Sequence, residues 1–340
     1  MTVTAGRLLL QQHTVMRILL VAVAASALLA ACDSTGDSIA SAPSDPDPKK
    51  TNGGGTTTNP VSLNGRRPFP ADNPWNTDIS ASEVDPNSPT LITSCGLRNL
   101  HPDFGTVYNG APNGIPYVIV HSGQKQVPVS FDYASESDPG PYPVPATAPI
   151  EGGATSTGDR HVLVLDVDAW KLYEMYDAHS LNGGTSWHAG SGAVFDLNSN
   201  ALRPAGWTSA DAAGLPIFPG LVRYDEVVEQ HAINHALRFT CPKTRKAYIS
   251  PARHYASSDT SSTLPPMGMR VRLKANFDTT AFTPNIRTIL RAMMRYGMLV
   301  ADNGSGWFVS GAPDSRWSDD ELSALARVPS TAFEVVKMNP

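Results

Sequence analysis

Acid–base side chains gather in one predicted β-hairpin, which spans residues 160–177. A tight turn near its middle sets the strand register and places His161 opposite Tyr176, with Glu174 on the same face. A histidine, a tyrosine and a carboxylate at the open end of one sheet face could transfer protons to and from a substrate. The alternative is a polar rim on a solvated sheet, because leucines occupy the rest of that face.

Carboxylates also fall in the predicted loops, and a rigid scaffold can present loop residues for function. The sequence offers Glu136, Asp138, Glu151, Asp159, Asp211, Asp225 and Glu226. Glycoside hydrolysis needs paired carboxylates, one as acid and the other as base or nucleophile. We select Asp159, Asp211 and Glu226 as candidates to join the hairpin residues, although aspartates also stabilise turns.

Two histidines, His231 and His235, have a spacing that binds zinc when the segment is helical. The catalytic zinc motif has Glu directly after the first His, where this chain has Ala232. The residues from Ala236 onward read as a strand, which breaks the helical geometry. We therefore expect no metal site, and we expect no cofactor.

Three cations, Arg270, Arg272 and Lys274, alternate along a predicted strand and share one face. A row of cations is typical of a solvated face. The alternative is a groove for an acidic glycan, in which a cation neutralises a uronic acid and a neighbouring His or Tyr takes the proton.

The elements that must position these residues are short strands. Apolar-alternating runs bounded by Gly and Pro turns predict two hairpins, over residues 115–133 and 161–177. Further strands are expected at 193–197, 236–240, 247–250, 269–275, 298–301, 307–310 and 333–337. Many short strands with such turns indicate a mainly β fold of the β-sandwich or jelly-roll kind.

Two or three short helices should brace the sheets. Pro284 fits the first position of a helix with an apolar face, and Gly297 ends it. Ser318 and Glu321 form a capping box that begins a second helix.

The N-terminal segment has the form of a secretory signal. Arg17 precedes an apolar run over residues 18–28, and Leu29-Ala30-Ala31-Cys32 closes it. This ending resembles the lipobox of bacterial lipoproteins. The resemblance implies that residues 1–31 are removed and that Cys32 is acylated. The lipid on Cys32 would then attach the protein to a membrane of the bacterial cell envelope, with the domain outside the cytoplasm.

Residues 32–66 read as a flexible tether. Ser, Thr, Gly, Asp and Pro dominate this segment, and such a composition cannot bury enough apolar surface to fold. Residues 67–340 then form a single β-rich domain, because Pro and Gly are scattered through them and mark no second linker.

The net charge of the chain bears on which partners the protein can bind. The 26 basic residues less Arg7 and Arg17 leave 24 against 31 acidic residues, a net charge of −7 after signal removal. This balance argues against a nucleic-acid partner.

Cys95 and Cys241 remain after Cys32, and an even count in an oxidising compartment predicts one disulfide. Two free buried thiols are the alternative.

The body of the chain resembles a family of uncharacterised secreted bacterial proteins. The resemblance covers most of residues 69–337 and runs through the motifs at 136–143, 158–164, 213–226 and 301–307. It implies a single domain, and it carries over neither an activity nor a catalytic residue.

Our first hypothesis is a lipid-anchored envelope enzyme that acts on a polysaccharide, as a glycoside hydrolase or a polysaccharide lyase. The export signal, the β-rich pattern and the loop carboxylates support it. Trp75, Trp187, Trp207 and Trp307 stand beside polar loop residues and could stack on sugars, although core packing explains most such side chains. The alternative is a non-catalytic envelope protein that binds a glycan or a protein partner.

Overall fold

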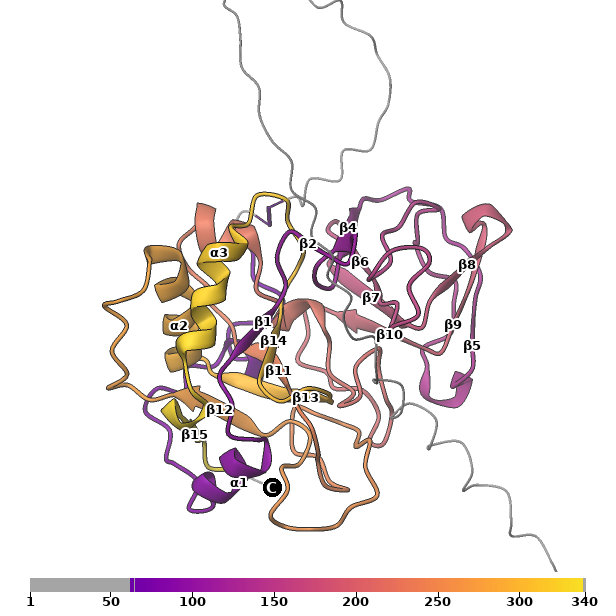
Figure 1. Cartoon of the computed structure of the whole chain (residues 1–340). Helices are drawn as coiled ribbons and strands as arrows, with labels where there is room; N and C mark the ends of the chain where they lie inside the picture. The colour runs from indigo at the N-terminus through magenta and orange to yellow at the C-terminus, as the bar shows by residue number, and fades with distance from the viewer. Residues whose placement is uncertain (1–61, 64, 339–340) are drawn as a thin grey trace, which may run out of the picture. The chain divides into compact units, whose positions relative to one another are not determined.

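The computed structural model describes residues 62–63 and 65–338. Their strands form a six-stranded, a four-stranded, a three-stranded and a two-stranded sheet (Figure 1). The helices are short: α1 (Ser88–Ser94), α2 (Pro284–Arg295) and α3 (Asp319–Leu322). The predicted mainly β class with a few short helices is confirmed.

The six-stranded sheet has the order β1-β14-β11-β13-β12-β15. Its strands are β1 (His101–Asp103), β11 (Leu237–Cys241), β12 (Arg270–Leu273), β13 (Met298–Asn303), β14 (Phe308–Ser310) and β15 (Phe333–Val335). Leu237 and Phe239 of β11 belong to the same apolar core as Ile289 and Met293 of α2. Because side chains alternate along a strand, Arg238 projects from the opposite face.

Helix α2 forms where the sequence predicts it. Thr283 caps its N-terminus, Pro284 is its first residue, and Gly297 follows its end with a φ of 69°. That left-handed φ is the reason a glycine suits the position. The second predicted helix is shorter, because α3 ends at Leu322 and a 3₁₀ turn continues over Ser323–Arg327.

The four-stranded sheet, in the order β10-β7-β6-β4, contains the hairpin predicted over residues 161–177. Its strands are β4 (Tyr117–Val120), β6 (Val162–Asp166), β7 (Lys171–Tyr176) and β10 (Ser191–Asp196). Val162 pairs with Met175, and Leu163 pairs with Glu174. The predicted register of this hairpin is therefore confirmed.

The hairpin predicted over residues 115–133 is wrong. Strand β4 pairs in parallel with β6, whereas β5 (Val129–Phe131) pairs in parallel with β9 (Ser186–Ala189). These last two strands belong to the three-stranded sheet, which β8 (His179–Leu181) completes. The chain therefore crosses from one sheet to another between β4 and β5.

Most of the other predicted strands are present, but the one at 247–250 is not. There Tyr248 forms only a single bridge with Met267. An additional small hairpin joins β2 (Val107–Tyr108) to β3 (Ala111–Pro112).

Both faces of the four-stranded sheet are covered. On one face, Val162 packs in a core with Trp187 of the three-stranded sheet. On the other face, Leu163 packs with Phe218, which belongs to the segment 209–222. This segment leads on to β11 of the six-stranded sheet, so it links the two larger sheets.

A disulfide joins Cys95, the residue after α1, to Cys241 at the end of β11. The two Cα atoms lie 4.9 Å apart, and both side chains are fully buried. The disulfide ties α1 to the six-stranded sheet, as the cysteine count predicts.

Arg270 and Arg272 of β12, and Lys274 directly after it, hold neighbouring segments in place. Arg270 donates hydrogen bonds to three backbone carbonyls, two of them in the segment 74–80. Arg272 pairs with Glu334 of β15 and donates to two further carbonyls of the same segment. Lys274 donates to a carbonyl just before β15. The three side chains are half-buried and hydrogen-bonded within the protein, so they do not form the solvated row.

Residues 1–61, and with them Cys32 and the predicted signal peptide, lie outside the described residues. Within the range 32–66 expected to be a tether, Leu63 is already buried, and Arg66 stacks over an aromatic ring. No helix in the described part of the chain is long and apolar enough to cross a membrane.

Candidate functional site

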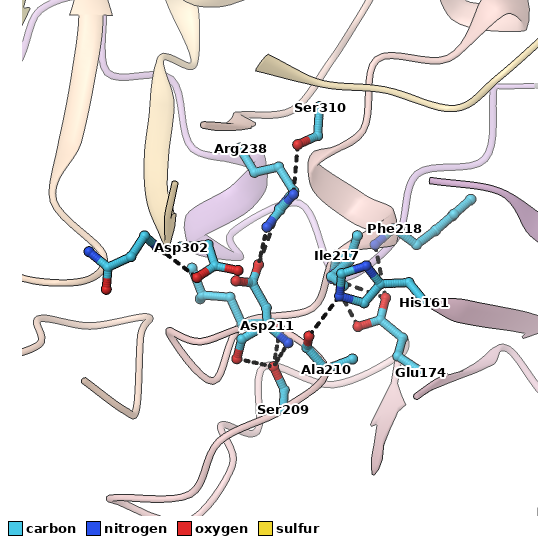
Figure 2. A network of polar contacts seen from close by, with 12 residues as sticks. His161, Glu174, Ser209, Ala210, Asp211, Ile217, Phe218, Arg238, Asp302 and Ser310 are labelled. Carbon is cyan, nitrogen blue, oxygen red and sulfur yellow. Dashed lines mark hydrogen bonds and ion pairs between the residues drawn. The ribbon is translucent and has the colours of Figure 1, made fainter. Parts of the chain in front are cut away.

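Most of the predicted acid–base residues converge where the four-stranded sheet, the segment 209–222 and the six-stranded sheet meet. Figure 2 shows the buried centre of this region, and we name its five ionisable side chains the junction cluster. The cluster consists of His161, Glu174, Asp211, Arg238 and Asp302. Three of the five were selected from the sequence.

His161 precedes β6 and is bound through both ring nitrogens. Its Nδ1 lies 2.6 Å from the Glu151 carboxylate, and its Nε2 lies 3.0 Å from the Ala210 carbonyl oxygen. Burial opposes a charge on this ring, but the Glu151 carboxylate outweighs it and raises the pKa of His161 to about 9. His161 is therefore an imidazolium at neutral pH, and no ring nitrogen remains free to accept a proton.

Glu174 of β7 is fully buried and accepts hydrogen bonds from the backbone. Ile217 N–H lies 2.9 and 3.0 Å from its two oxygens, and Phe218 N–H donates at 2.9 Å. Burial raises the pKa of Glu174 to about 7, although these donors favour the charged form. The side chain thus anchors the 3₁₀ turn Phe218–Gly220 to the four-stranded sheet.

Asp211 and Arg238 form a buried ion pair between the segment 209–222 and β11. Arg238 Nε and Nη2 each lie 3.1 Å from Asp211 Oδ2, and Nη1 lies 2.6 Å from Ser310 Oγ. The second oxygen of Asp211 has no hydrogen-bond partner among the described residues. Burial raises the pKa of Asp211 to about 6, against the effect of Arg238.

Asp302 lies near the end of β13, and its carboxyl stands beside that of Asp211 (Figure 2). One of its oxygens accepts a hydrogen bond from Asn303 N–H at 2.6 Å. Burial, reinforced by the Asp211 carboxylate, raises the pKa of Asp302 to about 7. Two neighbouring carboxyls that resist joint ionisation can share one proton.

Partly exposed side chains adjoin the cluster. Among these neighbours Tyr176 is half-buried, like Asp302 of the cluster itself, and Asp159 and Asp103 are exposed. Tyr176 packs against the ring of His161 with centroids 5.9 Å apart. Burial raises the pKa of Tyr176, and the charges of Asp159 and Asp302 add to the effect. The cluster is therefore bordered by a carboxyl-rich surface that solvent can reach.

Glu226 is the one selected residue that lies elsewhere. Its carboxylate pairs with Arg223 Nη2 at 2.6 Å and with His235 Nε2 at 3.1 Å, in a second buried group. The sequence prediction that Glu226 joins His161 is therefore wrong. His231 is exposed, and the segment from His231 to His235 is not helical.

Among the described residues, the histidines, cysteines and carboxylates form no group arranged to hold a metal ion. The tryptophans are mostly core residues: Trp75 and Trp187 are 2 % exposed, and Trp307 is fully buried. Only Trp207 of the four considered for sugar stacking is half-buried.

Sequence reasoning missed Arg238 and Asp302. A signal for Arg238 was present, because a charged residue between Leu237 and Phe239 interrupts an otherwise apolar strand. Asp302 likewise follows directly on an apolar run, at the end of a strand, where active-site residues are common.

The cluster can hold and exchange protons near neutral pH, because the buried carboxyls of Glu174 and Asp211 and the half-buried carboxyl of Asp302 have raised pKa values beside two cations. No protein-family model matches this chain, and comparison with curated proteins and with solved structures found no match.

Proposed function

We propose that this protein is a glycan-hydrolysing enzyme of the bacterial cell envelope, attached to a membrane through a lipid on Cys32. The observation that carries the proposal is the half-buried carboxyl of Asp302, whose pKa is raised to about 7 beside Asp211. A carboxyl that keeps its proton near neutral pH is suited to protonate the oxygen of a glycosidic bond.

Asp302 is the candidate general acid of this proposal. Asp159 is exposed beside it, and its charge contributes to the raised pKa of Asp302. Asp159 is the candidate base or nucleophile, because glycoside hydrolysis divides the two roles between two carboxyls. Tyr176 adjoins both the buried side chains of the junction cluster and the exposed Asp159, and its hydroxyl can hydrogen-bond a sugar hydroxyl.

His161 and Glu174 fit supporting roles better than proton transfer to substrate. Both ring nitrogens of His161 and both oxygens of Glu174 are already engaged within the protein. They position the segment 209–222, which carries Asp211, against the hairpin.

Hydrolysis is favoured over β-elimination. A lyase needs a cation free to neutralise the carboxylate of a uronic acid. Arg238 is 4 % exposed and already pairs with Asp211. The accessible neighbours, Asp103 and Asp159, are acidic and would repel a uronate. A neutral glycan therefore suits this surface.

The test is prolonged incubation of the full chain with a panel of neutral and uronic-acid-containing polysaccharides. Reducing ends would report hydrolysis, and ultraviolet absorbance would report unsaturated products of elimination. We expect reducing ends without unsaturation. We also expect Asp302→Asn to lower kcat by about 100-fold or more, whereas Asp320→Asn on the exposed first turn of α3 should not change it.

The pH profile gives a second readout. Since the general acid must be protonated, activity should fall as the pH rises above about 7, and Asp302→Asn should remove this limb. Product formation unaffected by Asp302→Asn would refute the assignment. Glycan binding without any turnover would instead support a non-catalytic envelope protein.

A further inference from the structure

A surface pocket of 590 Å³ lies beside the C-terminal half of α2 and shares no residue with the junction cluster. Its walls come from α2, β12, residues 231–234 and residues 78–80. Helix α2 lies alongside β12, as Figure 1 shows. Small-molecule sites have volumes of roughly 300–1,000 Å³, so the pocket is large enough for one.

The inner wall of the pocket is apolar. Ile233, Leu273 and Ala292 line it and are buried in the main core. The ring of Tyr296 and the half-buried side chain of Met294 extend this wall. An apolar group of a ligand would be covered there, which favours its transfer from water.

The rim of the pocket carries more positive than negative charge. Arg272 pairs with Glu334, and Arg295 Nε pairs with Asp78, each at 2.7 Å. Arg291 is exposed and makes no hydrogen bond or ion pair with any described residue. Three guanidinium groups thus face two carboxylates, and one positive charge has no counterion within the described part of the chain.

The unpaired charge of Arg291 and the unused N–H donors of Arg295 lie on the same side of α2. Arg291 and Arg295 are four residues apart on α2 and therefore project from the same side of the helix. Arg295 uses only Nε for its ion pair, so its two Nη groups remain available. Guanidinium groups in such an arrangement bind carboxylates and phosphates through paired hydrogen bonds.

We propose that this pocket binds a small amphiphilic anion, whose carboxylate or phosphate head contacts Arg291 and Arg295 and whose apolar part covers Leu273 and Tyr296. This binding site is separate from the proposed hydrolytic site, and neither depends on the other. A neutral ligand of the same shape would leave the Arg291 charge uncompensated and would bind more weakly.

The test is a titration of the full chain, labelled with ¹³C-methyl methionine, in nonionic detergent. The probes are butyrate, butyl phosphate, butanol and inorganic phosphate. The methyl signal of Met294 reports the pocket, and that of Met175, buried in another core, serves as the internal reference. We expect saturable shifts of Met294 alone with butyrate or butyl phosphate, and the tighter of the two identifies the preferred head group.

Substitutions on α2 test the role of charge. Arg291→Ala should weaken anion binding by about tenfold or more, and Arg291→Lys should keep most of it. Arg98→Ala, which removes an exposed arginine outside the pocket, should leave binding unchanged. Binding of butanol as tight as that of butyrate and butyl phosphate would overturn the proposal, as would an Arg291→Ala protein with unchanged affinity for the anions.

Discussion

Replacement of Glu174 by Gln should change how the stability of this protein depends on pH. Glu174 is fully buried, and its pKa rises from 4.5 to about 7 on folding. Between these two values the folded state holds a proton that the unfolded state has lost. Stability must therefore fall as the pH rises through this window.

The size of the effect follows from the two pKa values. A single carboxyl with these values stabilises the fold by about 2–3 kcal/mol more at about pH 5 than at about pH 8. Glutamine resembles the protonated acid, because it is neutral and keeps one carbonyl oxygen for the Ile217 and Phe218 N–H groups. The Glu174→Gln protein should thus match the unsubstituted protein at the lower pH and exceed it at the higher pH.

Urea unfolding followed by tryptophan fluorescence measures this difference, since several tryptophans are buried. His161, Asp211 and Asp302 also have raised pKa values and give a slope of the same sign, so only the difference between the two proteins isolates Glu174. Glu83→Gln, at an exposed carboxylate, is the matched control. If Glu174→Gln left the pH dependence intact, the buried protonation of Glu174 would be refuted.

Two further predictions concern covalent chemistry. Replacement of Cys95 and Cys241 by Ala should lower the free energy of unfolding by about 3–5 kcal/mol, because the disulfide closes a loop between residues 146 apart. Denaturant unfolding of both proteins under identical conditions would measure this loss. An unchanged midpoint of unfolding would contradict the prediction. Replacement of Cys32 by Ala should abolish incorporation of labelled fatty acid and leave uncleaved precursor or soluble protein, and label retained by the variant would overturn the lipoprotein assignment.

Local patterns determined the elements whose partners are close in sequence. The tight turn and alternation of residues 161–177 were sufficient for the register of the β6–β7 hairpin, because its pairing is set by a single turn. Thr283, Pro284 and Gly297 likewise delimited α2, because caps act within one helical turn. The placement of His161 and Glu174 on one face followed from the same register, whereas their burial did not.

Pairings between distant segments could not be predicted from the pattern. Strand β4 has the same alternation whether it pairs with β5 or with β6, and only the tertiary structure shows that it pairs with β6. Helix α1 was missed, because its seven residues form a helix through packing and not through a strong local pattern.

For the candidate site too, the sequence determined some features and the tertiary structure decided the others. The sequence by itself supplied the residue types, and it placed His161 and Glu174 on one face by strand alternation. Only the tertiary structure brought Asp302 beside Asp211 and joined Glu226 to His235. The reason is physical: a buried charge must find a partner in three dimensions, and its pKa depends on that burial and on charges from other strands.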